Sequence, residues 1–556
     1  MDYPYENLEN FTLPKLLDRS LELYPDEDAF AKVGDTPIKY SEFGKKIQTT
    51  IRLLQDNGIT ANDKVLLLSE NIPNWAVAYF AITYFGAVVV PVLPDFHPSD
   101  VHHILKHSEA KAIFVSDKHL STIEDESEVN IKFVINLEKL EIIDELSSTS
   151  YISKIRQKIS KISKVNYPNE DDLAAIIYTS GTTGHSKGVM LSHKNLVTNA
   201  MSSFSKIDIN KDDVFLSILP LAHTYECTAG LIIPILHGSS IYYIDKAPTP
   251  SVLLKAFSLV KPTFILSVPL IMEKIYKNKI LSKFNSSFLL KNLYKIKFFR
   301  KKLNYMAGKK LLETFGNRIR FFGIGGAPLS PYVEQFLIDS KFPYHIGYGM
   351  TESAPLIAGS AAFDTKVKLG STGTAFYGVD IRIKDKNATT GEGEIIVKSP
   401  SVMIGYYKDK EKTDEVLDGD WLLTGDLGYL DNDGFLFISG RSKNVIIGSA
   451  GENIYPEQIE ATINQNTVVL DSIVMEQNGK LIARIHLDYE QIDDMFDADK
   501  HSDTKIRAKI AEYLENMRLD VNSKLSSFSK ITKFIEQIEP FVKTPTKKIK
   551  RYLYTD

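Results

Sequence analysis

Small hydroxyl side chains, glycines and one lysine gather between residues 178 and 193, in the stretch YTSGTTGHSKGVMLSH. Backbone amides beside glycine can approach an anion closely, hydroxyl groups add donors and Lys187 adds positive charge, so the stretch predicts a cradle for a polyphosphate. Besides Lys187, the residues of this predicted cradle are Thr179, Ser180, Gly181, Thr182, Thr183, Gly184 and Gly188. A Walker A loop is excluded, because that motif places glycine directly before the lysine and Ser or Thr directly after it.

Apolar strand-like runs must position this cradle. LAAIIYTS (173–180) leads into it, and KVLLLSE (64–70), KAIFVSD (111–117) and PTFILSV (262–268) alternate with helical patterns. The alternation predicts an α/β fold with mostly parallel sheets covered by helices. Glycine-rich β-like segments between about 370 and 440 predict a small barrel-like or antiparallel layer, and short α+β elements with a lysine-rich tail follow Arg441.

The composition is that of an ordinary globular chain with more than one domain, at 556 residues, 43% hydrophobic and 24% charged. A single cysteine, Cys227, excludes an intramolecular disulfide, and the net charge of −4 gives no general attraction to nucleic acid. The first twenty residues are acidic and lack the apolar core of a secretory signal, so a cytoplasmic location is expected.

One uncharged segment, residues 71–94, has nearly the length of a membrane span. Gly86 divides it into a helix-like part, NWAVAYFAITYF, and a β-branched part with prolines, AVVVPVLP. The segment therefore predicts a buried helix followed by a buried strand.

The cradle stretch resembles the phosphate-binding signature of the adenylate-forming superfamily, which includes acyl-CoA synthetases, luciferases and peptide-synthetase adenylation domains. Further motifs follow in the order typical of that family, so the resemblance covers almost the whole chain. They are PLAHTYE (220–226), GIGGAPLS (323–330), YGMTE (348–352), WLLTGDLGYLDNDGFLFISGRSKNVI (421–446), GSAGENIYPEQIE (448–460) and TPTKKIKRYLY (544–554). Because Glu226 follows the aromatic residue of PLAHTYE, the chain is most similar to the long-chain acyl-CoA synthetase branch.

The resemblance implies roles on the acyl and adenine sides of one site. His223 and Tyr225 are expected to line the acyl pocket, with His223 near the substrate carboxylate. The residues expected at the adenine and at the border of the pocket are Gly325, Gly326, Ala327, Pro328, Tyr348 and Gly349. Thr351 is expected at the α-phosphate and Glu352 at Mg²⁺, a cation that takes oxygen ligands.

The resemblance also implies roles for charged residues near the C-terminus. Asp426 is expected to accept from both ribose hydroxyls, and Arg441 to approach the ribose or a phosphate. Lys443 falls at the hinge position of the family, which implies an AMP-binding domain over 1–440, a hinge at 441–443 and a mobile C-terminal domain over 444–556. Lys548 is expected to be the catalytic lysine, with Lys547 and Lys550 as alternatives, because an ammonium group can bridge the substrate carboxylate and the α-phosphate.

Together these features predict a two-step reaction, in which a fatty acid and Mg-ATP give an acyl-adenylate and pyrophosphate, and coenzyme A (CoA) then takes the acyl group. Two alternatives stay open at this point. One is an acyl-AMP ligase that loads a carrier protein, and the other is a non-catalytic protein on a lipid surface.

Two basic segments raise the hypothesis of peripheral contact with an anionic membrane at its inner face. Residues 274–310 contain twelve Lys or Arg and no acid, interleaved with large apolar residues, and residues 151–163 add a second basic pattern. An ordinary solvated surface is the alternative. The acidic residues 488–500 predict a solvated loop or helix without an assigned function.

Overall fold

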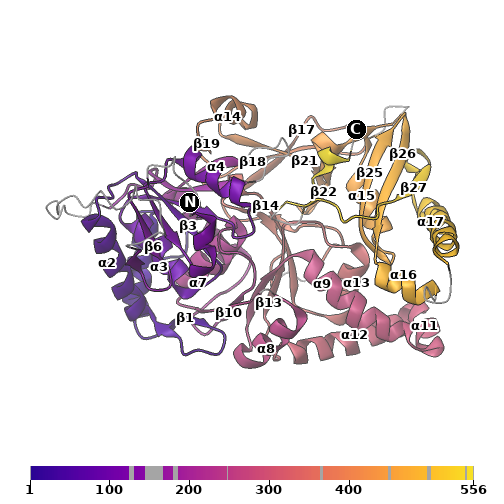
Figure 1. Ribbon diagram of the computed structural model, residues 1–556, viewed down its shortest axis with the longest axis horizontal. Coiled ribbons are helices and arrows are strands. Elements are labelled where there is room, and N and C mark those ends of the chain that lie inside the picture. Colours follow the sequence, from indigo (N-terminus) through magenta and orange to yellow (C-terminus); the bar gives the residue numbers. More distant parts are fainter. Residues whose placement is uncertain are drawn as a thin grey trace.

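Two large sheets flanked by helices form the body of the protein, and a smaller C-terminal unit lies at one side of it (Figure 1). The computed structural model describes residues 2–123, 131–143, 167–179, 186–246, 248–362, 367–448, 453–496, 502–544 and 548–554. The α/β class expected from the sequence is confirmed.

The first sheet has eight strands in the order β19-β9-β8-β4-β3-β5-β6-β7. Its five central strands, from β8 to β6, are parallel, and β9, β19 and β7 join antiparallel at its edges. The strands are β19 (Gly405–Tyr406), β9 (Lys187–Ser192), β8 (Leu173–Thr179), β4 (Val88–Val92), β3 (Lys64–Leu68), β5 (Ala112–Val115), β6 (Phe133–Asn136) and β7 (Glu141–Ile142). The runs KVLLLSE, KAIFVSD and LAAIIYTS are strands of this sheet, as predicted.

The second sheet has nine strands in the order β16-β15-β14-β13-β12-β10-β11-β1-β2, and it is parallel from β14 to β1. The strands are β16 (Thr374–Ala375), β15 (Leu356–Gly359), β14 (Tyr344–Gly349), β13 (Phe321–Ile324), β12 (Phe264–Ser267), β10 (Val214–Ser217), β11 (Ser240–Tyr243), β1 (Asp28–Lys32) and β2 (Ile38–Lys39). The run PTFILSV contributes β12, as predicted.

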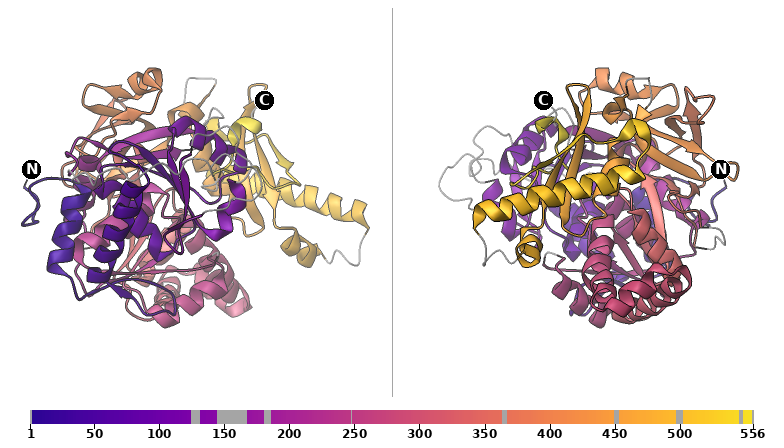
Figure 2. Two further views of the ribbon diagram at one scale, coloured as in Figure 1. Left: turned by 60° about the vertical axis from the view of Figure 1, so that its left-hand side comes forward. Right: turned by 90° about the vertical axis from the view of Figure 1, so that its right-hand side faces the viewer.

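Thirteen helices among the described residues connect and cover these strands (Figures 1 and 2). They are α1 (Leu13–Leu23), α2 (Tyr40–Asp56), α3 (Pro73–Tyr84), α4 (Pro98–Ser108), α5 (His193–Met201), α6 (Thr224–Cys227), α7 (Ile233–His237), α8 (Pro250–Val260), α9 (Pro269–Ile275), α10 (Ser282–Asn285), α11 (Phe288–Lys295), α12 (Lys297–Thr314) and α13 (Pro331–Ser340). A π-helical turn, Thr228–Ile232, links α6 to α7.

The uncharged segment 71–94 is a core element of the body. Helix α3 is buried on nearly all sides, Gly86 turns the chain at a φ of +81°, and the fully buried β4 follows. This outcome confirms the predicted helix and strand. In the described part of the chain, no helix is both long enough and apolar enough to cross a membrane.

A five-stranded antiparallel sheet follows the body. It pairs β17 (Asp380–Lys384), β18 (Gly393–Lys398), β21 (Trp421–Leu430) and β20 (Leu417–Asp418), with β22 (Leu436–Arg441) on the other part of β21, and α14 (Lys410–Val416) precedes β20. Gly434, at a φ of +80°, turns β21 into β22, as the Asp-Gly pair predicts. The pairing sets Asp426 opposite Arg441.

The C-terminal unit has its own apolar core, which includes Ile463, Ile485 and Leu487. It contains β23 (Ile446–Ile447), β24 (Asn453–Ile454), α15 (Pro456–Ile463), β25 (Val469–Gln477), β26 (Lys480–Leu487), α16 (Tyr489–Phe496), α17 (Asp503–Lys524) and β27 (Lys533–Glu536). Helix α15 begins at a proline and has Glu457 in its first turn, which confirms the predicted acidic start. The separate core is the physical basis for treating this unit as a domain.

Candidate active site

The hairpin of β8 and β9 holds both ends of the predicted phosphate cradle. Thr179 is the register partner of Lys187, so the loop between them starts and ends at neighbouring points. The cradle residues Ser180, Gly181, Thr182, Thr183 and Gly184 lie outside the described residues. The Lys187 Nζ atom lies 4.8 Å from the centroid of the Tyr406 ring, and burial lowers the pKa of Lys187 although Glu352 opposes this shift. Lys187 therefore lies within electrostatic range of Glu352.

The YGMTE segment begins with the last two residues of β14, and it brings three predicted site residues to the same region. The Tyr348 hydroxyl donates to Asp426 Oδ2 at 2.7 Å, and burial holds the pKa of Tyr348 well above its usual value. At Gly349, an added Cβ would lie 2.1 Å from the carbonyl oxygen of Pro355, so only glycine fits there. Glu352 Oε1 accepts a hydrogen bond from the Tyr406 hydroxyl at 2.8 Å.

The hydroxyl of Thr351 links this segment to the predicted acyl side of the site. Thr224, in PLAHTYE, donates from its Oγ1 to Thr351 Oγ1 at 3.3 Å. Two motifs that are more than a hundred residues apart in sequence are therefore in direct contact.

Asp426 and Arg441 face each other across β21 and β22. The Arg441 Nε atom lies 3.1 Å from Asp426 Oδ1, with the carboxylate side chain 7% exposed and the arginine side chain 51% exposed. The buried carboxylate is thus fixed by Tyr348 and Arg441, while the arginine keeps donors on the solvent side. Lys443 follows in a short 3₁₀ turn, Ser442–Asn444, and is exposed.

The predicted acyl residues pack against the glycines of GIGGAPLS. An added Cβ at Gly325 would lie 3.3 Å from the Tyr225 ring, and one at Gly323 would lie 2.8 Å from the Tyr225 hydroxyl. The next three residues, Gly326, Ala327 and Pro328, are exposed. This gives a wall of backbone and aromatic ring with an open lip, which suits a flat base or an acyl chain.

His223 is held as a neutral imidazole. Its Nδ1 atom accepts a hydrogen bond from the backbone N–H of Tyr225 at 3.2 Å, so the proton of the neutral ring is on Nε2. Burial lowers the pKa of His223 to about 4, and the positive charge of Lys548 adds to this shift. The Nε2–H group can therefore donate to a carboxylate near neutral pH.

Lys548 comes from the last residues of the chain and still lies at this site. Its side chain is exposed to solvent, but protein surrounds it closely enough for burial to lower its pKa. Arg441 lowers the pKa of Lys548 further, while Asp426 and Glu352 raise it. The ammonium group thus lies within electrostatic range of three predicted site residues and of His223.

The tail around Lys548 is fastened to the C-terminal unit. Lys543 forms an ion pair with Asp471 of β25 at 2.7 Å, and Arg551 pairs with Glu460 of α15. Any rotation of that unit would carry Lys548 with it. The alternative Lys547 lies outside the described residues. For Lys550, the hydrogen bonds given for the described residues include a backbone bond from its N–H to Val542 and none from its side chain to a predicted site residue.

The donor set fits Mg²⁺ bound together with a nucleotide. Among the described residues, no group of three or more His, Cys, Asp or Glu could hold a metal ion without another ligand. Glu352 is the candidate ligand, since within the described part of the chain its Oε2 atom has no hydrogen-bond partner. Mg²⁺ usually takes only one or two protein carboxylates and completes its shell with phosphates and water.

Tyr406 is a site residue that the sequence analysis missed. Its hydroxyl fixes Glu352 and its ring lies against Lys187, so it joins two predicted site residues. It reaches them because β19 pairs with β9, at Tyr406 and Val189. No local pattern in the sequence indicates that distant pairing.

Comparisons with known proteins agree with this arrangement. A family model described as "AMP-binding enzyme" matches residues 17–407. Long chain acyl-CoA synthetase 7, peroxisomal, of Arabidopsis thaliana is 30% identical over 566 aligned residues, which cover 92% of this chain and 79% of that protein. The 2-succinylbenzoate–CoA ligase of Oceanobacillus iheyensis is 29% identical over 82% of this chain and 84% of that protein.

The solved structures show the same fold. An O-succinylbenzoate coenzyme A synthetase from Bacillus subtilis, in complex with ATP and magnesium ion, has a TM-score of 0.74 at 22% identity, covering 97% of this chain and 98% of that one. The chain belongs to the AMP-binding enzyme family of the adenylate-forming superfamily. These matches support an AMP-forming acyl-CoA ligase, and the two relatives are named for different acids.

Proposed function

We propose that the protein converts a long-chain fatty acid, ATP and CoA into acyl-CoA, AMP and pyrophosphate. The observation that carries the proposal is the convergence of the C-terminal Lys548 with Glu352, Asp426, Arg441 and the neutral His223. A lysine and an arginine around one point, with a buried carboxylate beside them, suit a reaction that moves negative charge onto phosphate oxygens.

In the first step, an oxygen of the fatty acid carboxylate attacks the α-phosphorus of ATP. The new bond joins the carboxylate to the α-phosphate, and the bond to the β-phosphate breaks, so pyrophosphate leaves with the electron pair. We assign Lys548 to the reacting oxygens and His223 Nε2–H to the carboxylate. We assign Asp426 to the ribose hydroxyls and Lys187 to the phosphates, as the family resemblance implies. This assignment is supported by the electrostatic range of Asp426 to Lys548 and of Lys187 to Glu352.

Magnesium is assigned to Glu352 and the phosphates, where it would neutralise charge on pyrophosphate as it leaves. Tyr406 orients the Glu352 carboxylate for that purpose through its hydrogen bond to Oε1. The adenine is assigned to the open lip at Gly326, Ala327 and Pro328, beside Tyr348 and Gly349, and Thr351 to the α-phosphate.

In the second step, the CoA thiol attacks the activated carbonyl and releases its proton to the solvent, and AMP leaves with the oxygen that joined it to the acyl group. We propose that residues 444–556 rotate about 441–443 between the steps. The tail anchors at Asp471 and Glu460 belong to the rotating unit, so the rotation would withdraw Lys548. Lys443 is exposed in the turn where the chain leaves β22, which suits a hinge position.

A long-chain acid is the finer part of the proposal. It is supported by the relative named as a long chain acyl-CoA synthetase. A cytoplasmic location is a further part of the same proposal.

Purified protein with ATP, Mg²⁺, CoA and one acid at a time tests the function. The expected result is AMP and acyl-CoA in equal amounts, with a higher kcat/KM for palmitate than for hexanoate, benzoate or 2-succinylbenzoate. If AMP is released but no acyl-CoA forms, and if adding an acyl carrier protein then gives an acylated carrier, the acceptor is the carrier protein and not CoA. No acid-dependent AMP formation with any acid would contradict the enzymatic proposal.

A further inference from the structure

Residues 274–310, which run from the end of α9 into α12, form a basic segment that contains no acidic residue. Of the twelve Lys or Arg in residues 274–310, Arg300 lies near Asp339 and Lys277 donates to the backbone oxygen of Asn464. The other ten are exposed lysines: Lys274, Lys279, Lys283, Lys291, Lys295, Lys297, Lys301, Lys302, Lys309 and Lys310. In the described part of the chain, none of these ten forms an ion pair.

The same helices expose large apolar side chains. Seven of the 24 exposed large apolar residues described by the structure fall within residues 288–306, so they are concentrated there. They are Phe288 (86% exposed), Leu289, Ile296, Phe298 (72% exposed), Phe299, Tyr305 and Met306. Leaving this many large apolar groups in water is unfavourable unless a partner covers them.

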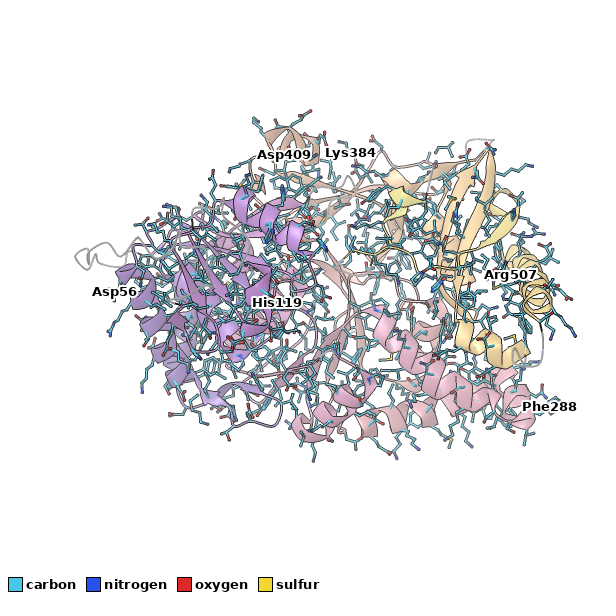
Figure 3. All side chains as sticks on the ribbon, viewed as in Figure 1. Asp56, His119, Phe288, Lys384, Asp409 and Arg507 are labelled. Carbon is cyan, nitrogen blue, oxygen red and sulfur yellow. The ribbon has the colours of Figure 1, made fainter. Side chains whose placement is uncertain are left out.

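Basic and apolar residues share the outward faces of α11 and α12. On α12, Phe298, Lys302 and Lys309 are spaced at i, i+4 and i+11, which places them on one side of the helix. On α11, Phe288 and Lys291 are spaced at i and i+3. Figures 1 and 2 show both helices at the outer edge of the molecule, and Figure 3 shows Phe288 at its margin.

We propose that the outward faces of α11 and α12 form a docking surface for an anionic lipid bilayer. The lysine ammonium groups would approach lipid phosphates while Phe288, Leu289 and Phe298 enter the boundary between headgroups and acyl chains. A second copy of the chain fits less well, because a two-fold contact would bring the ten lysines against ten others. A nucleic acid would pair with the lysines but leave the apolar groups in water.

Docking does not depend on which acid the enzyme activates. It can therefore fail or succeed separately from the proposed function.

Vesicle sedimentation tests the docking surface with the full-length protein. The protein is expected to sediment at low salt with vesicles that contain phosphatidylglycerol and phosphatidylcholine, and to be released from them by high salt. It should not sediment with vesicles of phosphatidylcholine alone. Replacing Lys291, Lys302 and Lys309 by Gln should weaken partitioning by roughly 100-fold, at about fivefold per lysine. The matched control replaces three exposed lysines on other elements, Lys45, Lys386 and Lys480, and should weaken it far less.

Insertion of the apolar groups is tested by fluorescence. The Phe288→Trp variant should shift its emission to shorter wavelength with anionic vesicles, whereas Phe528→Trp, at a 46% exposed position of the C-terminal unit, should not. Thermal unfolding of each variant checks that it is folded. The proposal is overturned by absent sedimentation at low salt, by equal weakening in the control triple variant, or by an unshifted emission of the Phe288→Trp variant. A dimer that the lysine variant dissociates, without vesicle binding, would assign the surface to a second copy instead.

Discussion

Lys548→Ala removes the ammonium group from the site and should leave the fold of the tail intact, because other residues hold the tail in place. The tail is fastened by the ion pairs of Lys543 with Asp471 and of Arg551 with Glu460. The main chain of Lys548 is fixed separately, because its carbonyl accepts from Thr544 N–H at 2.7 Å and its N–H donates to the Thr544 hydroxyl at 3.1 Å. The substitution therefore tests the side chain itself.

The size of the effect follows from where the ammonium group lies. A unit charge about 4 Å from the reacting oxygens contributes about 1 kcal/mol in water and about 4 kcal/mol at the effective dielectric constant near a protein surface. Lys548 is solvent-accessible but surrounded by charged protein groups, so we expect the upper part of this range once substrates fill the site. Adenylation should then slow by on the order of 10² to 10³.

The two half-reactions must be measured separately. Acid-dependent exchange between pyrophosphate and ATP reports adenylation, and release of AMP from supplied palmitoyl-adenylate and CoA reports thioester formation. Only the first should fall strongly in Lys548→Ala, because the proposed rotation withdraws Lys548 before the second.

The neighbouring basic residue Lys550 provides the matched control. Lys550→Ala should leave both half-reactions near the wild-type rate. Equal losses in both half-reactions for Lys548→Ala, or a larger loss for Lys550→Ala, would refute the division of labour between the two steps.

Three other predictions concern single side chains. Tyr406→Phe removes the hydroxyl that donates to Glu352 and should raise the Mg²⁺ concentration for half-maximal adenylation about 10- to 100-fold. Tyr407→Phe, which removes a hydroxyl that donates to the exposed Glu109, should leave this concentration unchanged. Equal effects of the two substitutions would contradict the positioning role of Tyr406. Burial raises the pKa of Glu226 to about 8, so the stability that its neutral form contributes is complete below about pH 4.5 and is lost as the pH rises toward 8. The free energy of unfolding of Glu226→Gln should therefore rise relative to that of the wild type by roughly 1.4 kcal/mol per pH unit across this window, which thermal unfolding at several pH values would show. A difference that stays constant with pH would count against a buried neutral acid. Gly325→Ala places a methyl group against an aromatic ring of the acyl side and should lower kcat/KM for palmitate more than for hexanoate, a result that uniform losses for both acids would exclude.

Local sequence patterns were sufficient for much of the fold. Short continuous apolar runs such as KVLLLSE are typical of strands buried on both faces of a parallel sheet. Gly86 separates a helix from a strand because only glycine readily adopts a φ of +81° there. The Asp-Gly turn before β22 likewise depends on a few neighbouring residues. Such features are encoded where they occur.

Contacts between distant segments could not be predicted from these patterns. Strand β19 has two residues, and its pairing with β9 is what brings Tyr406 to Lys187 and Glu352. The neutral state of His223 is similar, because burial and the tail lysine set it together. The motifs predicted which residues matter, whereas their charge states and supporting contacts depend on tertiary packing.

The transfer of a carboxylate oxygen to AMP tests the central claim most directly. Palmitate labelled with ¹⁸O in both carboxyl oxygens would be incubated with the protein, Mg-ATP and CoA, and the AMP analysed by mass spectrometry. Attack of the carboxylate on the α-phosphorus predicts one ¹⁸O atom in the phosphate of each AMP and one in palmitoyl-CoA. Unlabelled AMP, or ADP as the nucleotide product, would contradict the account.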